Sequence, residues 1–183
     1  MYGASDRILA MRLTLMAGSD QRIRHAVSKA HRRVDGDWNH AKVQSAITKM
    51  RSLDERNTRR MKEAIARHGW PGTSRVGRTG AQYAWLLVQH ADHDLDFQRR
   101  CLELLKEAVE KGDASPMHLA YLIDRVRVAE GLPQVYGTQV RNGSEPFPIE
   151  NQANVDARRS EVGLPPLADQ MRRMIEFHIA NRE

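Results

Sequence analysis

The chain has 183 residues, 40% of them hydrophobic and 28% charged, with a formal net charge of +6. This composition is typical of a folded globular protein, and the length suits one domain, or one domain with an appendage. The single Cys101 excludes an internal disulfide and a zinc site built from cysteines. No run approaches the roughly 18–20 apolar residues of a membrane span, and no signal-peptide pattern opens the chain. These features predict a cytoplasmic protein without a membrane segment.

The positive charge is concentrated near the N-terminus. Residues 1–62 contain 14 Lys or Arg against 6 Asp or Glu, whereas the rest of the chain is slightly acidic. Basic patches of this kind favour an acidic partner, either an acidic protein such as a carrier protein or a nucleic acid. Nucleic acid is the weaker alternative, because Tyr2 and Trp38 are the only Phe, Trp or Tyr residues there for stacking on bases. A solvated helix face explains the same charges.

Helical spacing of apolar residues dominates the first 70 residues. It predicts four helices, over about 4–17, 19–34, 38–53 and 54–69. Gly18-Ser19-Asp20 is expected to interrupt the first pair, and Asp54 to cap the last helix. A loop is expected over 70–80. The basic segment 1–53 is interpreted as an accessory helical segment, or a dimerisation arm that would make a homodimer, attached to a helical domain over 54–183.

The middle of the chain has the clearest helix boundaries. The helix containing AWLLVQH ends near His90, and Asp94 is expected to cap the next one, which ends at Gly112. Ser115 and Pro116 are the expected cap and first residue of a further helix. Each of these predictions rests on local sequence signals at both helix ends.

The last 50 residues contain short extended runs as well as helical patterns. Short extended runs around Asn142-Gly143 predict a small β-hairpin near residues 136–149. A short helix ending at Gly163 and a longer final helix follow. The fold class is therefore mainly α, a compact domain of about seven or eight helices with one small hairpin.

A cluster of titratable residues marks the first candidate site. Two histidines and three aspartates fall within HADHDLD, residues 90–96, where one helix gives way to the next. In the catalytic interpretation His90 is a general base, and Asp92 or Asp124 is the carboxylate that orients it. In the structural interpretation the aspartates are turn and cap residues, and His90 meets the helix dipole.

Polar residues elsewhere complete the candidate pocket. Asp124-Arg125 interrupts an apolar stretch, which favours either an internal salt bridge, to Arg158 or Glu150, or a clamp for a substrate carboxylate. PQVYGTQ, residues 133–139, either contacts a substrate or ties a hairpin to the helices. The candidate substrate contacts are Gln89, Arg125, Gln134, Tyr136, Thr138 and Gln139.

A divalent metal is the alternative chemistry for this cluster. Imidazole and carboxylate ligands suit zinc, iron or manganese, and the ligands would be His90, His93 and Glu150. The spacing is short and lacks the HExxH pattern of metalloproteases. No nucleotide-cofactor motif, phosphate loop or nucleophile elbow occurs. A divalent metal is therefore the one cofactor for which the sequence offers candidate ligands, and the cofactor is otherwise unknown.

Several short motifs occur in an order typical of one family. They are HGWP (68–71), AWLLVQHAD (84–92), LAYLIDRV (119–126), PQVYGTQ (133–139), PIE (148–150), VDARR (155–159) and VGLPPL (162–167). Over about residues 54–180 the chain resembles an uncharacterised bacterial family, a domain of unknown function. Such sequences often read DHDP where this chain has Leu95. The resemblance implies no activity.

Two hypotheses about function follow, and whether the protein is an enzyme stays open between them. The first is a small-molecule enzyme, with acid/base or metal-assisted hydrolysis or proton transfer at the pocket of His, Asp and Gln residues. The second is a non-catalytic module that docks an acidic partner through the basic N-terminal helices. Charge reversal at Arg32 and Arg33 is one test of docking.

Overall fold

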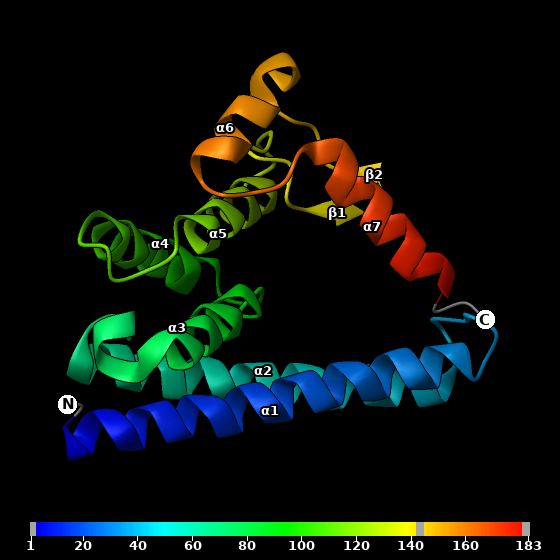
Figure 1. Ribbon diagram of the computed structural model, residues 1–183. Helices are drawn as coiled ribbons and strands as arrows, with labels where there is room; N and C mark the ends of the chain where they lie inside the picture. The colour runs from blue at the N-terminus through cyan, green and yellow to red at the C-terminus, as the bar shows by residue number, and fades with distance from the viewer. Residues whose placement is uncertain (1–2, 142–144, 181–183) are drawn as a thin grey trace. The chain divides into compact units, whose positions relative to one another are not determined.

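The computed structural model describes residues 3–141 and 145–180, and its contacts divide the chain into two compact units, Met1–Phe97 and Gln98–Glu183. Seven α-helices lie within the described residues (Figure 1): α1 Ala4–Arg32, α2 Ala41–His68, α3 Thr73–Gln89, α4 Leu95–Glu110, α5 Pro116–Ala129, α6 Val155–Glu161 and α7 Leu167–Ala180. A two-stranded hairpin and a 3₁₀ turn complete the secondary structure described. The mainly α fold class is confirmed. None of the described helices combines the length and the apolar character needed to cross a membrane.

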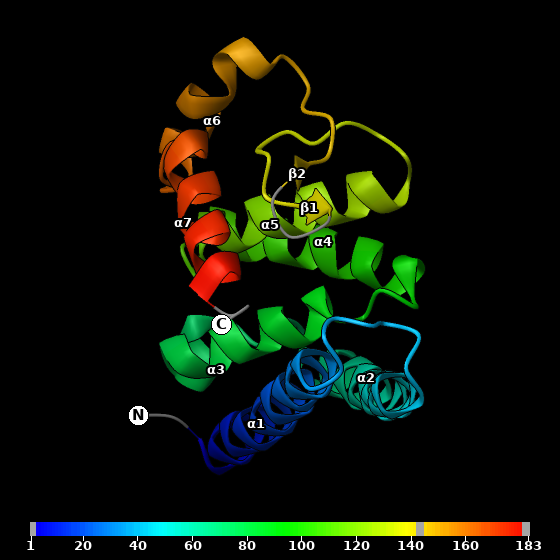
Figure 2. The same ribbon diagram turned by 90° about the vertical axis from the view of Figure 1, so that its right-hand side faces the viewer.

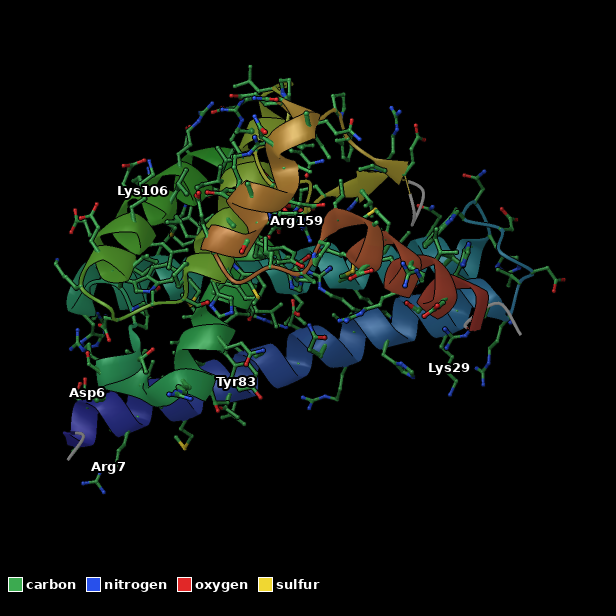
Figure 3. All side chains as sticks on the ribbon, turned by 45° about the horizontal axis from the view of Figure 1, so that its top comes forward. Asp6, Arg7, Lys29, Tyr83, Lys106 and Arg159 are labelled. Atoms are coloured by element: carbon green, nitrogen blue, oxygen red, sulfur yellow. The ribbon has the colours of Figure 1, made fainter. Side chains whose placement is uncertain are left out.

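The first unit is built on two long helices. α1 and α2 run side by side in opposite directions, and α3 packs against both (Figures 1 and 2). Their buried apolar residues form the core: Leu9, Leu13, Met16, Val43, Met61, Ala84, Leu87 and Val88. An ion pair of 3.2 Å between Asp6, labelled in Figure 3, and Arg75 further joins α1 to α3.

Two expected helix breaks are wrong. α1 passes through Gly18-Ser19-Asp20 without interruption, and the Ser19 hydroxyl donates to the Leu15 carbonyl one turn earlier. One glycine costs a helix only about 1 kcal/mol, which packing along the buried stripe outweighs. α2 likewise passes through Asp54, whose carboxylate binds Arg24 of α1 instead of capping a helix.

The loop expected over 70–80 is mostly helical. α3 begins at Thr73, and a residue with non-helical dihedrals, Gly77 (φ 72°, ψ 169°), interrupts it. Other boundaries agree with the sequence signals. Gly69 ends α2, and the Asp94 carboxylate accepts a 3.1 Å hydrogen bond from the Phe97 amide at the start of α4. Asp94 therefore caps α4, as expected.

The second unit combines the remaining helices with the hairpin. β1 (Val140–Arg141) pairs antiparallel with β2 (Glu145–Pro146), and a parallel bridge joins Gln134 to Ile149. The hairpin lies where the sequence predicted it, although the turn expected at Asn142-Gly143 falls outside the described residues. The apolar core of this unit includes Cys101, Leu105, Ala120, Leu122, Val126, Val155 and Leu164.

The two compact units meet within α4. The boundary between them falls at Phe97. Residues 4–53 supply α1 and much of α2, and α1 shares the core of the first unit with α3. The basic N-terminal segment is therefore an integral part of a three-helix unit.

Candidate functional site

His90 lies at the centre of a charged cluster in the first unit. It follows the last residue of α3, and its Nδ1 lies 2.9 Å from both carboxylate oxygens of Asp20 on α1. Asp20 is fully buried, whereas 19% of the His90 side chain is exposed. The structure thus gives Asp20 the orienting position that the sequence analysis assigned to Asp92 or Asp124.

Arg24 connects this pair to α2. Its guanidinium lies 3.3 Å from Asp20 and 2.9 Å from Asp54. Its Nε also lies 3.0 Å from Nδ1 of His90, which cannot both accept this proton and donate one to Asp20. An ionised carboxylate only accepts, so we assign the proton to Nδ1, which donates to Asp20, and treat the approach of Arg24 as a contact.

The pKa values of the two carboxyl groups in this cluster, Asp20 and Asp54, are shifted in opposite directions. Burial opposes ionisation of Asp20, but the hydrogen bond and charge of His90, together with Arg24, outweigh it and lower the Asp20 pKa below 3.8. At Asp54 burial is the largest effect, and with the nearby charge of Asp20 it raises the pKa despite Arg24. Asp20 therefore stays ionised over a wider pH range than Asp54.

The other predicted residues of this segment surround His90 in the sequence but have different environments. Gln89 is buried and Asp92 and His93 are exposed. Among the side chains that the structure describes, no three from His, Cys, Asp or Glu are arranged to hold a metal ion. The metal interpretation of His90, His93 and Glu150 therefore gains no support, and Glu150 is paired with Arg127 in the second unit.

Asp124 belongs to the second unit, where it organises the loop after α5. It is fully buried, and its carboxylate accepts the backbone N–H groups of Val135, Tyr136 and Thr138 and the Thr138 hydroxyl, at 2.7–3.2 Å. These four donors match the acceptor capacity of a carboxylate. Its described partners are this loop rather than Arg158 or Glu150. The geometry thus supports a positioning role for Asp124.

The remaining residues of PQVYGTQ are largely occupied by the same loop. The buried Gln134 amide donates to the carbonyls of Gln139 and Phe147, and its oxygen accepts the Gln139 N–H at 2.6 Å. Gln139 in turn donates to the Thr138 hydroxyl. Thr138 also lines a small hollow of about 310 Å³ with Tyr121, Gln170, Arg173 and Met174. Of the two interpretations of PQVYGTQ, the contacts favour the structural one, in which the segment connects the hairpin to the helices.

Arg159 is a buried residue whose role the sequence analysis missed. The side chain, labelled in Figure 3, is fully buried on α6 and donates to the carbonyls of Tyr136 and Pro165 and to Gln170. Burial lowers the pKa of its guanidinium below the usual value of arginine, although Tyr121, Asp156 and Asp124 oppose this effect. Arg158 beside it donates to the Val135 and Glu150 carbonyls. Arg158 and Arg159 therefore both bind backbone carbonyls of the segments around them.

Gly137 is expected to tolerate a side chain poorly. Its φ is +68°, and a Cβ there would lie 2.7 Å from Ile149 Cδ1 and 3.0 Å from Leu167 Cδ1. Gly137→Ala should lower the unfolding free energy by about 2–3 kcal/mol, mostly through strain at positive φ, with a smaller part from overlap that movement of the Ile149 and Leu167 side-chain ends relieves only partly. Urea unfolding measures this loss. Gly131→Ala, also at positive φ but without neighbours within 4 Å, is the control for strain alone. Equal losses in the two variants would contradict the close packing around Gly137.

The positions of Asp20 and Asp54 on the apolar stripes of their helices are the sequence signal that marks them as buried. Asp20 continues the helical spacing of Leu9, Leu13 and Met16, and Asp54 and Asn57 continue that of Val43, Ile47 and Met50. A polar residue on a buried stripe needs a partner from another element. Asp124 meets this criterion on α5, and Asp20 and Asp54 meet it on α1 and α2.

Comparison with known proteins identifies the family. No curated protein and no solved structure matches the chain. A family model described as a family of unknown function, DUF6624, matches residues 8–179. The match begins well before residue 54, where the resemblance seen in the sequence began, and it includes the helices that carry Asp20, Arg24 and Asp54. The chain belongs to this family of unknown function, DUF6624.

Proposed function

We propose that the protein is an enzyme that moves a proton on a small-molecule substrate, with His90 as general base and Asp20 as the residue that positions it. The observation that carries this proposal is the 2.9 Å contact between Nδ1 of His90 and the fully buried carboxylate of Asp20. A carboxylate at Nδ1 fixes the ring orientation and leaves Nε2 unprotonated. Nε2 is then the nitrogen that takes the proton.

The surrounding charges suit this task. After His90 accepts a proton, its imidazolium lies against an ionised carboxylate, which stabilises the charged form. Asp20 and Asp54 both hold Arg24 beside the ring, and the positive charge of Arg24 helps to keep Asp20 ionised. Two carboxyl groups with pKa values shifted in opposite directions around one histidine are typical of acid/base sites. Hydrolysis and isomerisation by proton transfer both use such a base.

A general base can serve the cleavage of several kinds of bond, so the first assay uses substrates of different bond types. Chromogenic carboxylic esters, phosphate esters and arylamides would be screened with purified full-length protein. On any substrate that is turned over, His90→Gln should lower kcat/KM by about 10²–10⁴-fold, the usual contribution of a general base. Asp20→Asn should lower it as well, because the amide favours the wrong tautomer of His90.

A matched control is available three residues away. His93 is exposed, so His93→Gln should leave kcat/KM within about twofold of the unchanged protein. Circular dichroism and the melting temperature, Tm, establish that each variant is folded. Equal activity in folded His90→Gln, or an equal loss in His93→Gln, would contradict the assignment of His90 as the base.

A further inference from the structure

A groove runs between α1 and α2 in the first unit, and none of its lining residues is His90, Asp20, Arg24 or Asp54. Its volume is about 930 Å³, and its lining spans Ser5 to Ile23 on α1 and Leu53 to His68 on α2. At 1.5 Å per residue the α1 side is about 27 Å long. Ala10, which lies near Gly80 of α3, is on the opposite side of α1 from the lining residues Ile8 and Arg12. The groove therefore lies on the face turned away from α3.

The groove combines an apolar floor with a basic rim. Leu9, Leu13, Met16 and Met61 form the buried floor, while Ile8 and Leu15 are large apolar lining residues that remain 49% and 63% exposed. The exposed charged residues of the lining are five arginines and one glutamate: Arg12, Arg22, Arg56, Arg60, Arg67 and Glu63. An elongated apolar surface with positive charge on both sides suits an amphipathic, negatively charged occupant.

The spacing of the lining residues indicates a helix. On α1 the residues 5, 8, 12, 15, 19 and 22 recur at alternating steps of three and four, as do 53, 57, 60, 64 and 67 on α2. This is the heptad spacing by which helices receive the side chains of another helix. Two antiparallel helices that both present such stripes on one face form a groove into which a third helix can pack.

Asn57 gives independent support for a helical partner. It lies on the α2 stripe, is only 3% exposed, and neither its Oδ1 nor its Nδ2 has a hydrogen-bond partner in the part of the chain that the structure describes. A buried amide without partners destabilises the free protein. Asparagine at the corresponding position of a coiled coil pairs with a polar residue of the partner helix. A helix with one polar residue at this level would satisfy Asn57.

We propose that this groove binds an acidic amphipathic α-helix from a partner protein. Leucine-like residues of that helix would cover Leu9, Leu13 and Met61, and its flanking carboxylates would meet the five arginines. A second copy of this chain is the poorer occupant, since it would bring the same arginine rim against itself. The proposal concerns a binding surface and does not depend on proton transfer at His90.

The probe is a synthetic fluorescent peptide of about 21 residues, long enough to span the groove. It has leucine at the first and fourth positions of each heptad and glutamate at most exposed positions. Fluorescence anisotropy with the full chain should show micromolar binding that weakens as salt increases. A peptide with lysine in place of glutamate, and a scrambled peptide without the leucine stripe, should each bind at least about tenfold more weakly.

Variants of the chain separate the groove from general basic charge. Arg12→Glu with Arg60→Glu should weaken binding of the acidic peptide at least about tenfold, because both arginines lie on the rim. Arg32→Glu with Arg33→Glu changes the same number of charges outside the lining and should change binding by less than about threefold. All four arginines are exposed, so both variants should fold.

Asn57→Leu provides a second readout. Removing the unpartnered amide should raise the Tm of the free chain by about 2–4 °C and tighten binding of the all-leucine peptide. Four results would overturn the proposal: no binding, equal binding of the scrambled peptide, equal effects of the two arginine pairs, or a lower Tm with weaker binding in Asn57→Leu. A homodimer that Arg12→Glu with Arg60→Glu abolishes would instead make a second copy the occupant.

Discussion

Asp124→Ala is expected to lower the unfolding free energy of the protein by about 3–5 kcal/mol. The substitution removes the acceptor of three backbone N–H groups and one hydroxyl, and the Thr138 amide and hydroxyl are buried with it. Each buried donor left without a partner costs about 1–3 kcal/mol, and relaxation of the loop recovers part of the sum. At about 2–4 °C per kcal/mol, the Tm should fall by about 6–20 °C.

Two further variants sharpen this test. Asp124→Asn keeps one oxygen acceptor but turns an NH₂ group toward the remaining donors, so its loss should approach that of alanine. Glu110→Ala removes an exposed carboxylate from α4 and should change the free energy by less than about 0.5 kcal/mol. A Tm of Asp124→Ala close to that of the unchanged protein would contradict the role of Asp124 as the organiser of residues 135–138.

Asp20→Ala is the second substitution with a large expected effect. Asp20 is fully buried beside His90 and Arg24, and its loss leaves both without their shared carboxylate. Removing one partner of a buried ionic cluster costs about 3–5 kcal/mol, and the partial exposure of His90 and Arg24 reduces this to about 2–4 kcal/mol at pH 7. Chemical unfolding of both proteins at pH 7, 5 and 3 measures the difference.

The pH dependence of this difference has a definite sign. The folded-state pKa of Asp20 lies below its unfolded value of 3.8, so its contribution is present above that value. The contribution is lost as the pH falls through the lower, folded pKa. The gap between Asp20→Ala and the unchanged protein should therefore be smaller at pH 3 than at pH 5. A gap that widens at pH 3 would contradict the ion pairing of Asp20.

Asp54 supplies the comparison within the same cluster. Its folded pKa is raised, so the ionised form is disfavoured by folding, and its protonation is easier in the folded than in the unfolded state. Asp54→Asn, a near-isosteric neutral replacement, should therefore cost less at pH 7 than Asp20→Asn. Equal costs would mean that Arg24 holds both carboxylates equally.

Local signals explain which parts of the fold could be predicted. The cap at Asp94, the proline at Pro116 and the hairpin near 136–149 depend on neighbouring residues, and each lies where the sequence placed it. The expected break at Gly18-Ser19-Asp20 also rests on local signals, yet α1 continues. Its buried stripe packs on α2 and α3, and this tertiary gain exceeds the local preference for a turn.

The candidate site was found only in part for a related reason. His90 and Asp124 stood out because each is polar beside apolar residues, but their partners come from contacts that the sequence does not display. Asp20 lies 70 residues before His90, and the donors to Asp124 are backbone amides 11–14 residues after it. Residue type indicates that a buried carboxylate needs donors, whereas only the folded chain determines which donors it meets.

The most direct test of the account is the tautomer of His90, measured by long-range ¹H–¹⁵N correlation NMR of the full-length protein. The neutral ring should carry its proton on Nδ1, where it donates to Asp20, and Asp20→Asn should shift the population toward the Nε2–H form. His93, which is exposed, is the internal reference in the same spectrum. A proton on Nε2 in the unchanged protein would contradict the orientation of His90 by Asp20, and with it the assignment of His90 as the base.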